Sequence, residues 1–68
     1  MFVKLKMPVM IHHDYNTEIT IKENALCEVV NYDLESKYIC LKTITDKKSF
    51  YLPLDAFKII TTELEGGI

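Results

Sequence analysis

Three consecutive residues, His12, His13 and Asp14, form the one cluster in this 68-residue chain whose side chains are common metal ligands. Neighbouring residues of an extended chain point to opposite sides, so at most His12 and Asp14 would converge. A metal site needs three or four ligands, and no further group has suitable spacing. The pattern therefore favours a polar loop, and we expect neither a metal nor another cofactor.

The two cysteines, Cys27 and Cys40, are candidate nucleophiles only if a histidine base lies near one of them. No sequence feature places one there, so we expect Cys27 to be a small core residue and Cys40 to hold a half-exposed strand position. Two cysteines do not make a disulfide scaffold, and both glycines lie near the C-terminus, outside any phosphate-binding loop. We therefore expect a non-enzymatic protein with reduced thiols.

The chain has eight basic residues, all lysine, and a net charge of −2. Arginine is the usual residue for bidentate contacts with phosphate and guanine, so its absence counts against nucleic-acid recognition. Lysines without arginine also fit an AT-rich coding sequence, such as that of a low-GC bacterium or its phage. We rank protein above nucleic acid as the expected partner.

Length and hydropathy predict one domain of residues 1–62, followed by a flexible tail of residues 63–68. Gly66 and Gly67 cannot hold a strand, and nothing in the sequence fixes the tail. The hydrophobic content of 49 % suffices for a core. The longest apolar run near the start, Pro8–Ile11, is too short for a signal peptide or a membrane span. We expect a cytoplasmic protein without membrane association.

Alternation of apolar and polar residues predicts short strands separated by polar turns. Proline lacks an N–H donor, so Pro8 places its stretch at a sheet edge or a bend. The absence of a convincing helix and the short strands together favour a small closed β-barrel. The alternating segments are Val3–Ile11, Thr17–Lys22, Leu26–Tyr32, Tyr38–Thr45 and Ser49–Leu52.

The segment Phe50–Ile60 is expected to close this barrel. Phe50 and Leu52 alternate with Tyr51, and Pro53 then ends the ladder of hydrogen bonds. A single tight turn follows, and an alternating strand resumes at Phe57–Ile59.

A consistent register places three strands around one apolar face. If Thr43 pairs with Phe50, Leu41 lies opposite Leu52. If Val29 pairs with Ile39, Cys27 lies opposite Leu41 on that same face. A slip of one residue would turn all of these side chains to water. In this register Cys40 lies on the other face, so the two cysteines do not form a bridge.

The chain resembles an SH3-like barrel over most of residues 9–60. His13-Asp14-Tyr15 resembles the Tyr-Asp-Tyr part of the ALYDY segment, and Glu18–Ile21 resembles the ELSF strand. Tyr51–Phe57 resembles the strand, proline, 3₁₀ turn and closing strand of that family. The resemblance implies an all-β fold: a five-stranded SH3-like barrel with a one-turn 3₁₀ helix near Pro53–Ala56.

The peptide-binding groove of true SH3 domains is incomplete in this sequence. Ala56 falls where the family has a groove tyrosine, and the chain has no tryptophan. The resemblance therefore implies the barrel without supporting the binding of Pro-rich peptides. An alternative fold is a ubiquitin-like β-grasp, with residues 2–22 as its first hairpin and Ala25–Leu34 as its helix.

The leading hypothesis is a protein-binding module that acts through its surface. Such a module could be an adaptor, a homo-oligomer subunit, or an inhibitor of a host protein encoded by a phage or mobile element. Its expected binding residues are His13, Asp14, Tyr15, Asn16, Asp33, Tyr38 and Tyr51, because tyrosines that a small core cannot hold make good interface anchors. The alternative is an RNA- or DNA-binding barrel that uses Lys42, Lys47, Lys48 and the same tyrosines.

Overall fold

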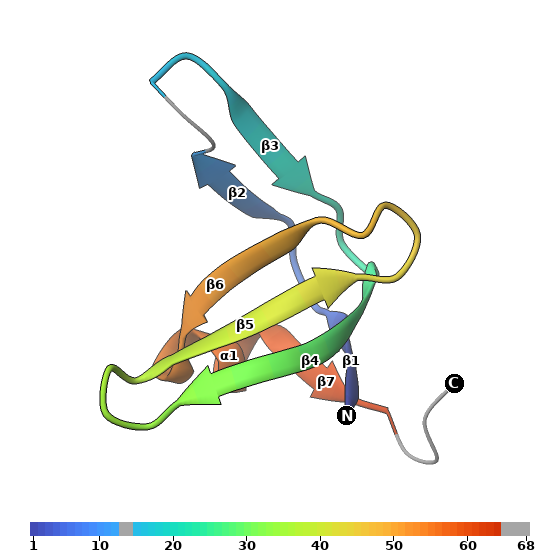
Figure 1. The fold of residues 1–68 in the computed structure, drawn as a ribbon. Coiled ribbons are helices and arrows are strands. Elements are labelled where there is room, and N and C mark those ends of the chain that lie inside the picture. The colour runs from blue at the N-terminus through green and yellow to red at the C-terminus, as the bar shows by residue number, and fades with distance from the viewer. Residues whose placement is uncertain (13–14, 65–68) are drawn as a thin grey trace.

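The computed structural model describes residues 1–12 and 15–64, which form an all-β domain with one short helix (Figure 1). The all-β fold class predicted from the alternating pattern is confirmed. In chain order the elements are β1 (Phe2–Leu5), β2 (Val9–His12), β3 (Glu18–Ile21), β4 (Leu26–Asp33), β5 (Tyr38–Thr43), β6 (Ser49–Pro53), α1 (Leu54–Ile60) and β7 (Thr61–Glu63).

Five strands form one antiparallel sheet in the order β6-β5-β4-β1-β7, and β2 and β3 form a separate hairpin. The predicted closed barrel is wrong in one respect, because the edge strands β6 and β7 do not pair with each other in the described chain. Helix α1 lies between them in sequence and packs across the inner side of the sheet (Figure 1). The sheet therefore remains open along two edges.

The first predicted strand, Val3–Ile11, is divided into β1 and β2. The break falls at residues 6–8, where Pro8 cannot donate to a ladder. The N–H of Lys6 donates to the carbonyl oxygen of Ile60 (2.7 Å), which is the last bond joining this stretch to the chain beside β7. Beyond it the chain leaves the sheet and enters the hairpin of β2 and β3.

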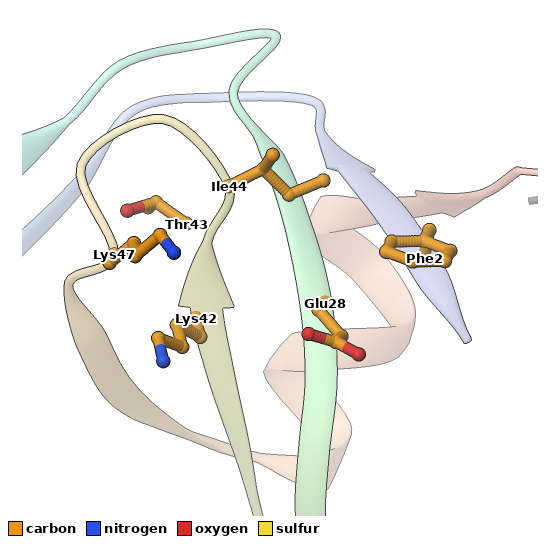
Figure 2. A pocket seen from close by; sticks show the side chains of 6 residues that line it. All are labelled: Phe2, Glu28, Lys42, Thr43, Ile44 and Lys47. Atoms are coloured by element: carbon orange, nitrogen blue, oxygen red, sulfur yellow. The ribbon is translucent and has the colours of Figure 1, made fainter. Parts of the chain in front are cut away.

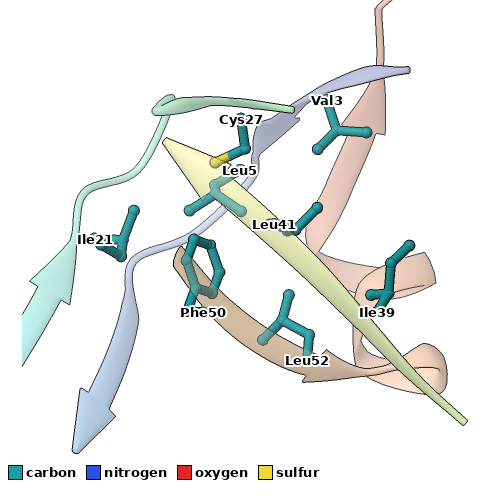
Figure 3. Close-up of a cluster of buried hydrophobic side chains, with 8 residues drawn as sticks. All are labelled: Val3, Leu5, Ile21, Cys27, Ile39, Leu41, Phe50 and Leu52. Carbon is teal, nitrogen blue, oxygen red and sulfur yellow. The ribbon is translucent and has the colours of Figure 1, made fainter. Parts of the chain in front are cut away.

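The hydrophobic core lies on the inner side of the five-stranded sheet, between the sheet, helix α1 and the base of the hairpin (Figure 3). Alternating residues of β1, β4, β5 and β6 point into it, as the period-two pattern predicts. Leu5, Cys27 and Leu41 are fully buried. The whole buried cluster is Val3, Leu5, Ile21, Cys27, Ile39, Leu41, Phe50 and Leu52.

The strand register differs by two residues from the predicted one. Leu41 lies opposite Phe50 and Val29, whereas the predicted partners were Leu52 and Cys27. The cause is the length of the turns, because the β5–β6 loop spans residues 44–47 instead of Asp46-Lys47 alone. A shift of two residues leaves every side chain on its predicted face, so the predicted apolar face is retained.

A β-bulge at Val30 then changes the faces at the end of β4. Strict alternation from the inward residue Val29 would also turn Asn31 inward. The extra residue lets Asn31 pair with Cys40 instead, which places Asn31 on the outward side of the sheet. Asp33 follows on the same outward side. The bulge is therefore what brings two polar residues to the outer face.

Helix α1 replaces two predicted elements, the one-turn 3₁₀ helix at Pro53–Ala56 and the closing strand at Phe57–Ile59. The apolar residues of this segment fit both the strand period of two and the helix period of about 3.6, and packing against the core selects the helix. Phe57 is half-buried against the core, whereas Ile59 is 68 % exposed. A strand would have turned both residues to the same side.

The last strand is β7, which the sequence analysis assigned in part to the tail. Thr61, Thr62 and Glu63 pair with β1, and the N–H of Leu64 donates to the carbonyl oxygen of Phe2 (3.0 Å). Residues 65–68 lie outside the described chain. The alternative β-grasp is wrong, because its expected helix at Ala25–Leu34 is strand β4.

Candidate functional site

The outer face of β4, β5 and β6 carries a group of side chains that we call the tyrosine patch: Asn31, Asp33, Tyr38, Cys40 and Tyr51. Two cross-strand rows build it. Asn31, Cys40 and Tyr51 lie opposite one another, and Asp33 lies opposite Tyr38 in the next outward row. Tyr38 and Tyr51 are therefore diagonal neighbours on one face, a spacing that aromatic side chains can bridge.

The two tyrosines are exposed and the cysteine between them is not. Tyr51 is 69 % exposed and Tyr38 47 %, whereas Cys40 is 7 % exposed. The predicted half-exposed position of Cys40 is wrong, because Asn31 and Tyr51 flank it on the two neighbouring strands. The two exposed tyrosines therefore flank a covered position of the sheet.

Asp33 holds the turn between β4 and β5. One carboxylate oxygen accepts hydrogen bonds from the N–H groups of Glu35 (2.9 Å) and Ser36 (3.3 Å). The bonds from Ser36 and Glu35 lower the pKa of Asp33 below its ordinary value of 3.8, because they stabilise the charged form. Asp33 is exposed, so its carboxylate fixes the turn and still faces solvent at the rim of the patch.

A shallow depression of about 210 Å³ lies on the patch. It is smaller than the pockets of roughly 300–1,000 Å³ that hold small organic ligands. Three of its lining residues, Asp33, Tyr38 and Tyr51, belong to the predicted site. Sequence reasoning missed the others, Asn31, Tyr32, Ser36 and Cys40, and for Asn31 the signal was hidden because its face depends on the bulge.

The remaining predicted residues are not part of this patch. Tyr15 and Asn16 lie in the loop between β2 and β3, at the opposite end of the molecule from the turn between β4 and β5 (Figure 1). Tyr15 is fully exposed there. His13 and Asp14 lie outside the described residues. The structure therefore divides the predicted surface into two separate regions.

A second cavity, of about 350 Å³, lies on the same outer face farther along the strands (Figure 2). Figure 2 shows Glu28 on β4 between Lys42 on β5 and Phe2 on β1. The register places these three residues in one row. Glu28 thus sets a negative charge directly beside Lys42, which reduces the attraction of this region for phosphate groups. The cavity is lined by Phe2, Glu28, Lys42, Thr43, Ile44 and Lys47.

The two cysteine thiols do not form a disulfide. Both thiols are free, and burial raises the pKa of Cys27 above its ordinary value. The raised pKa keeps Cys27 in the less nucleophilic thiol form. Within residues 1–12 and 15–64, His, Cys, Asp and Glu side chains do not gather in threes at a spacing that would hold a metal ion.

Comparison with known proteins gives no family for this domain: no family model, curated protein or solved structure matches the chain. The fold and the patch thus define an all-β domain with an exposed aromatic surface. The described residues contain no helix that is both long and apolar enough to cross a membrane.

Proposed function

We propose that this protein is a non-enzymatic protein-binding module and that the tyrosine patch is its binding surface. The observation that carries the proposal is the pair of exposed rings, Tyr38 and Tyr51, set diagonally over the buried Cys40. Tyrosine combines a large apolar area with a polar tip and loses little conformational entropy on binding, so it is enriched among residues that dominate binding energy.

The surroundings of the rings support a protein partner. The patch lies on three hydrogen-bonded strands, which fix the backbone positions of the two tyrosines before binding and so reduce the entropic cost of association. Asn31 and Asp33 supply polar groups at its rim. The depression is shallow and small, which suits a side chain of a partner protein better than an enclosed small molecule.

The proposal includes the SH3-like character of the fold. Its support is the order of elements at the C-terminal end: strand β6, Pro53, a short helix, and a last strand that returns to pair with β1. We further propose a cytoplasmic adaptor, or an inhibitor of a host protein, from a low-GC bacterium or its phage. The two free thiols and the lysine-only basic residues support this origin and compartment.

The test is a pull-down from the lysate of a low-GC bacterium with three proteins: wild type, Tyr51→Ala and Tyr15→Ala. Tyr15→Ala is the matched control, because it makes the same chemical change at an exposed tyrosine outside the patch. We expect a protein that survives nuclease treatment, is lost with Tyr51→Ala and is retained with Tyr15→Ala. Recovery that is equal for all three proteins would contradict the proposal.

The alternative function, binding of single-stranded nucleic acid, has one observation in its favour. Lys42 is a diagonal neighbour of Tyr51 on the outer face, and basic and aromatic residues together suit nucleic acid. The double variant Lys47→Glu, Lys48→Glu separates the two functions. It should abolish nucleic-acid binding, which also falls steeply with salt, and leave protein binding by the patch nearly unchanged.

A further inference from the structure

Strand β6 lies at an edge of the sheet, and a single copy of this chain leaves one side of it unpaired within the part that the structure describes. β6 ends the sheet order, and β5 pairs with one of its sides only. Two hydrogen bonds show which backbone groups of this strand face β5. The N–H of Thr43 donates to the carbonyl oxygen of Lys48, and the N–H of Leu54 donates to the carbonyl oxygen of Lys37 (both 2.9 Å). In an antiparallel ladder alternate residues point their backbone groups away from the neighbour. The groups that point outward therefore belong to Ser49, Tyr51 and Pro53.

This edge is longer and more open than the other edge of the sheet. At β7 the N–H of Thr61 is already bonded to the carbonyl oxygen of Phe57, and the strand has three residues. At β6 the outward residues Ser49, Tyr51 and Pro53 are all exposed. Exposed strand edges of this kind are templates for a further strand.

We propose that β6 pairs antiparallel with β6 of a second copy of this chain, with Tyr51 opposite Tyr51. In this register each Tyr51 N–H donates to the Tyr51 carbonyl oxygen of the other copy. Each Ser49 N–H donates to the Pro53 carbonyl oxygen of the other copy. Because Pro53 has no N–H, the Ser49 carbonyl oxygen opposite it is the one outward group that bonds to water instead. The edge is thus complementary to itself about a two-fold axis through Tyr51.

The charges that flank β6 agree with an antiparallel pair. Lys47 and Lys48 precede the strand and Asp55 follows it. Asp55 lies in the first turn of helix α1, directly after the strand, so an antiparallel pair centred on Tyr51 brings the lysine end of each β6 toward the Asp55 end of the other. A parallel arrangement would instead bring like charges together. Opposite charges at the two ends of the pair favour the antiparallel orientation.

The pairing would also enlarge the tyrosine patch. Residues directly opposite in an antiparallel pair point to the same face, so the two Tyr51 rings would be neighbours. Tyr38 of each copy would flank them, and two small patches would become one continuous aromatic surface. Two paired strands of this length bury less area than a standard stable interface, so the dimer should form in a concentration-dependent way.

The experiment measures molar mass by sedimentation equilibrium over a range of concentrations. Ser49→Pro removes an outward N–H and leaves both tyrosines in place, and Ser49→Thr is the matched control that keeps the N–H. Wild type and Ser49→Thr should approach twice the monomer mass. Ser49→Pro should weaken the dimer by about tenfold, since two hydrogen bonds are lost per dimer.

A second variant tests the same register in the opposite direction. Pro53→Ser supplies the missing N–H toward the Ser49 carbonyl oxygen of the second copy and should tighten the dimer by about tenfold. This gain keeps the test decisive if Ser49→Pro fails to fold, which circular dichroism would reveal. A monomer at every concentration for both wild type and Pro53→Ser would overturn the proposal, as would a dimer that Ser49→Pro leaves unchanged. Tyr51→Ala keeps its N–H, so loss of partner binding and loss of the dimer are separable.

Discussion

Cys40 lies directly opposite Tyr51 on neighbouring strands and is 7 % exposed, although both residues belong to the outward face of the sheet. The pair is of the type in which the two backbones do not bond to each other, because the bonds of β5 and β6 fall at the alternate positions. Side chains in such pairs approach most closely. The exposed ring and the covered thiol therefore form one structural unit.

The first prediction concerns this unit. Tyr51→Ala should uncover the Cys40 thiol, so that one thiol per folded chain reacts quickly with a thiol-specific reagent. Cys27 should stay unreactive because it is fully buried and its pKa is raised. Tyr15→Ala serves as the control and should leave both thiols as slow as in the wild type. Equal thiol reactivity in all three proteins would show that Tyr51 does not cover Cys40.

The second prediction compares the same substitution at two isoleucines. Ile39 is 5 % exposed and Ile59 is 68 % exposed. Ile39→Ala should lower the free energy of unfolding by about 2–5 kcal/mol. Ile59→Ala should change it by no more than about 0.5 kcal/mol, because it is a surface site and alanine favours a helix. Urea denaturation measures both, and Ile39→Val, with an expected loss of about 0.5–1.5 kcal/mol, replaces Ile39→Ala if that variant does not fold.

The third prediction concerns acid. The pKa of Asp33 is lower in the folded chain than its ordinary value of 3.8, so the unfolded chain takes up the proton more readily. The stability due to this carboxylate is therefore fully present above pH 3.8 and is lost as the pH falls through the lowered folded pKa. Wild type should be more stable than Asp33→Asn near neutral pH, and the difference should shrink as the pH falls below 3.8. A difference that stays constant with pH would contradict a role for the charge.

The fourth prediction concerns the β5–β6 turn, where Lys47 has φ 56°. A side chain in this left-handed region is strained, and glycine is not. Lys47→Gly should raise the free energy of unfolding by up to about 1 kcal/mol, the net of relieved strain and the entropy of glycine. Lys48→Gly is the control, since Lys48 is outside the left-handed region and should lose about 0.5–1 kcal/mol. Thermal unfolding compares the two variants.

The faces of the strands could be predicted from the sequence, because alternation depends only on neighbouring residues. Leu41, Phe50 and Leu52 point inward as predicted, although their partners are shifted by two residues. The register could not be predicted, because it depends on how many residues each turn contains. A loop that is longer by two residues shifts the register by two and leaves the apolar pattern intact.

Two local features could not be predicted from the alternating pattern, for different reasons. The run Phe57-Lys58-Ile59 fits a strand and a helix equally well, and packing against the core selects the helix. The bulge at Val30 has no composition signal, yet it turns Asn31 outward and completes the candidate site. The tyrosines could be identified from the sequence because they exceed what so small a core can hold. The covering of Cys40 could not, since it depends on the cross-strand pairing.

The hairpin of β2 and β3 has a consequence for the dynamics of the domain. Val9 pairs with Ile21 and Ile11 with Ile19; Ile21 belongs to the buried core cluster, and the other three are partly buried against it. A two-stranded ribbon is marginally stable by itself, so this arm depends on these contacts with the core. Its backbone amides should exchange with deuterated solvent sooner than those of β5, and sooner near His12 than near Ile21. The domain would then combine a slowly opening sheet with an arm that opens many times before the sheet unfolds once.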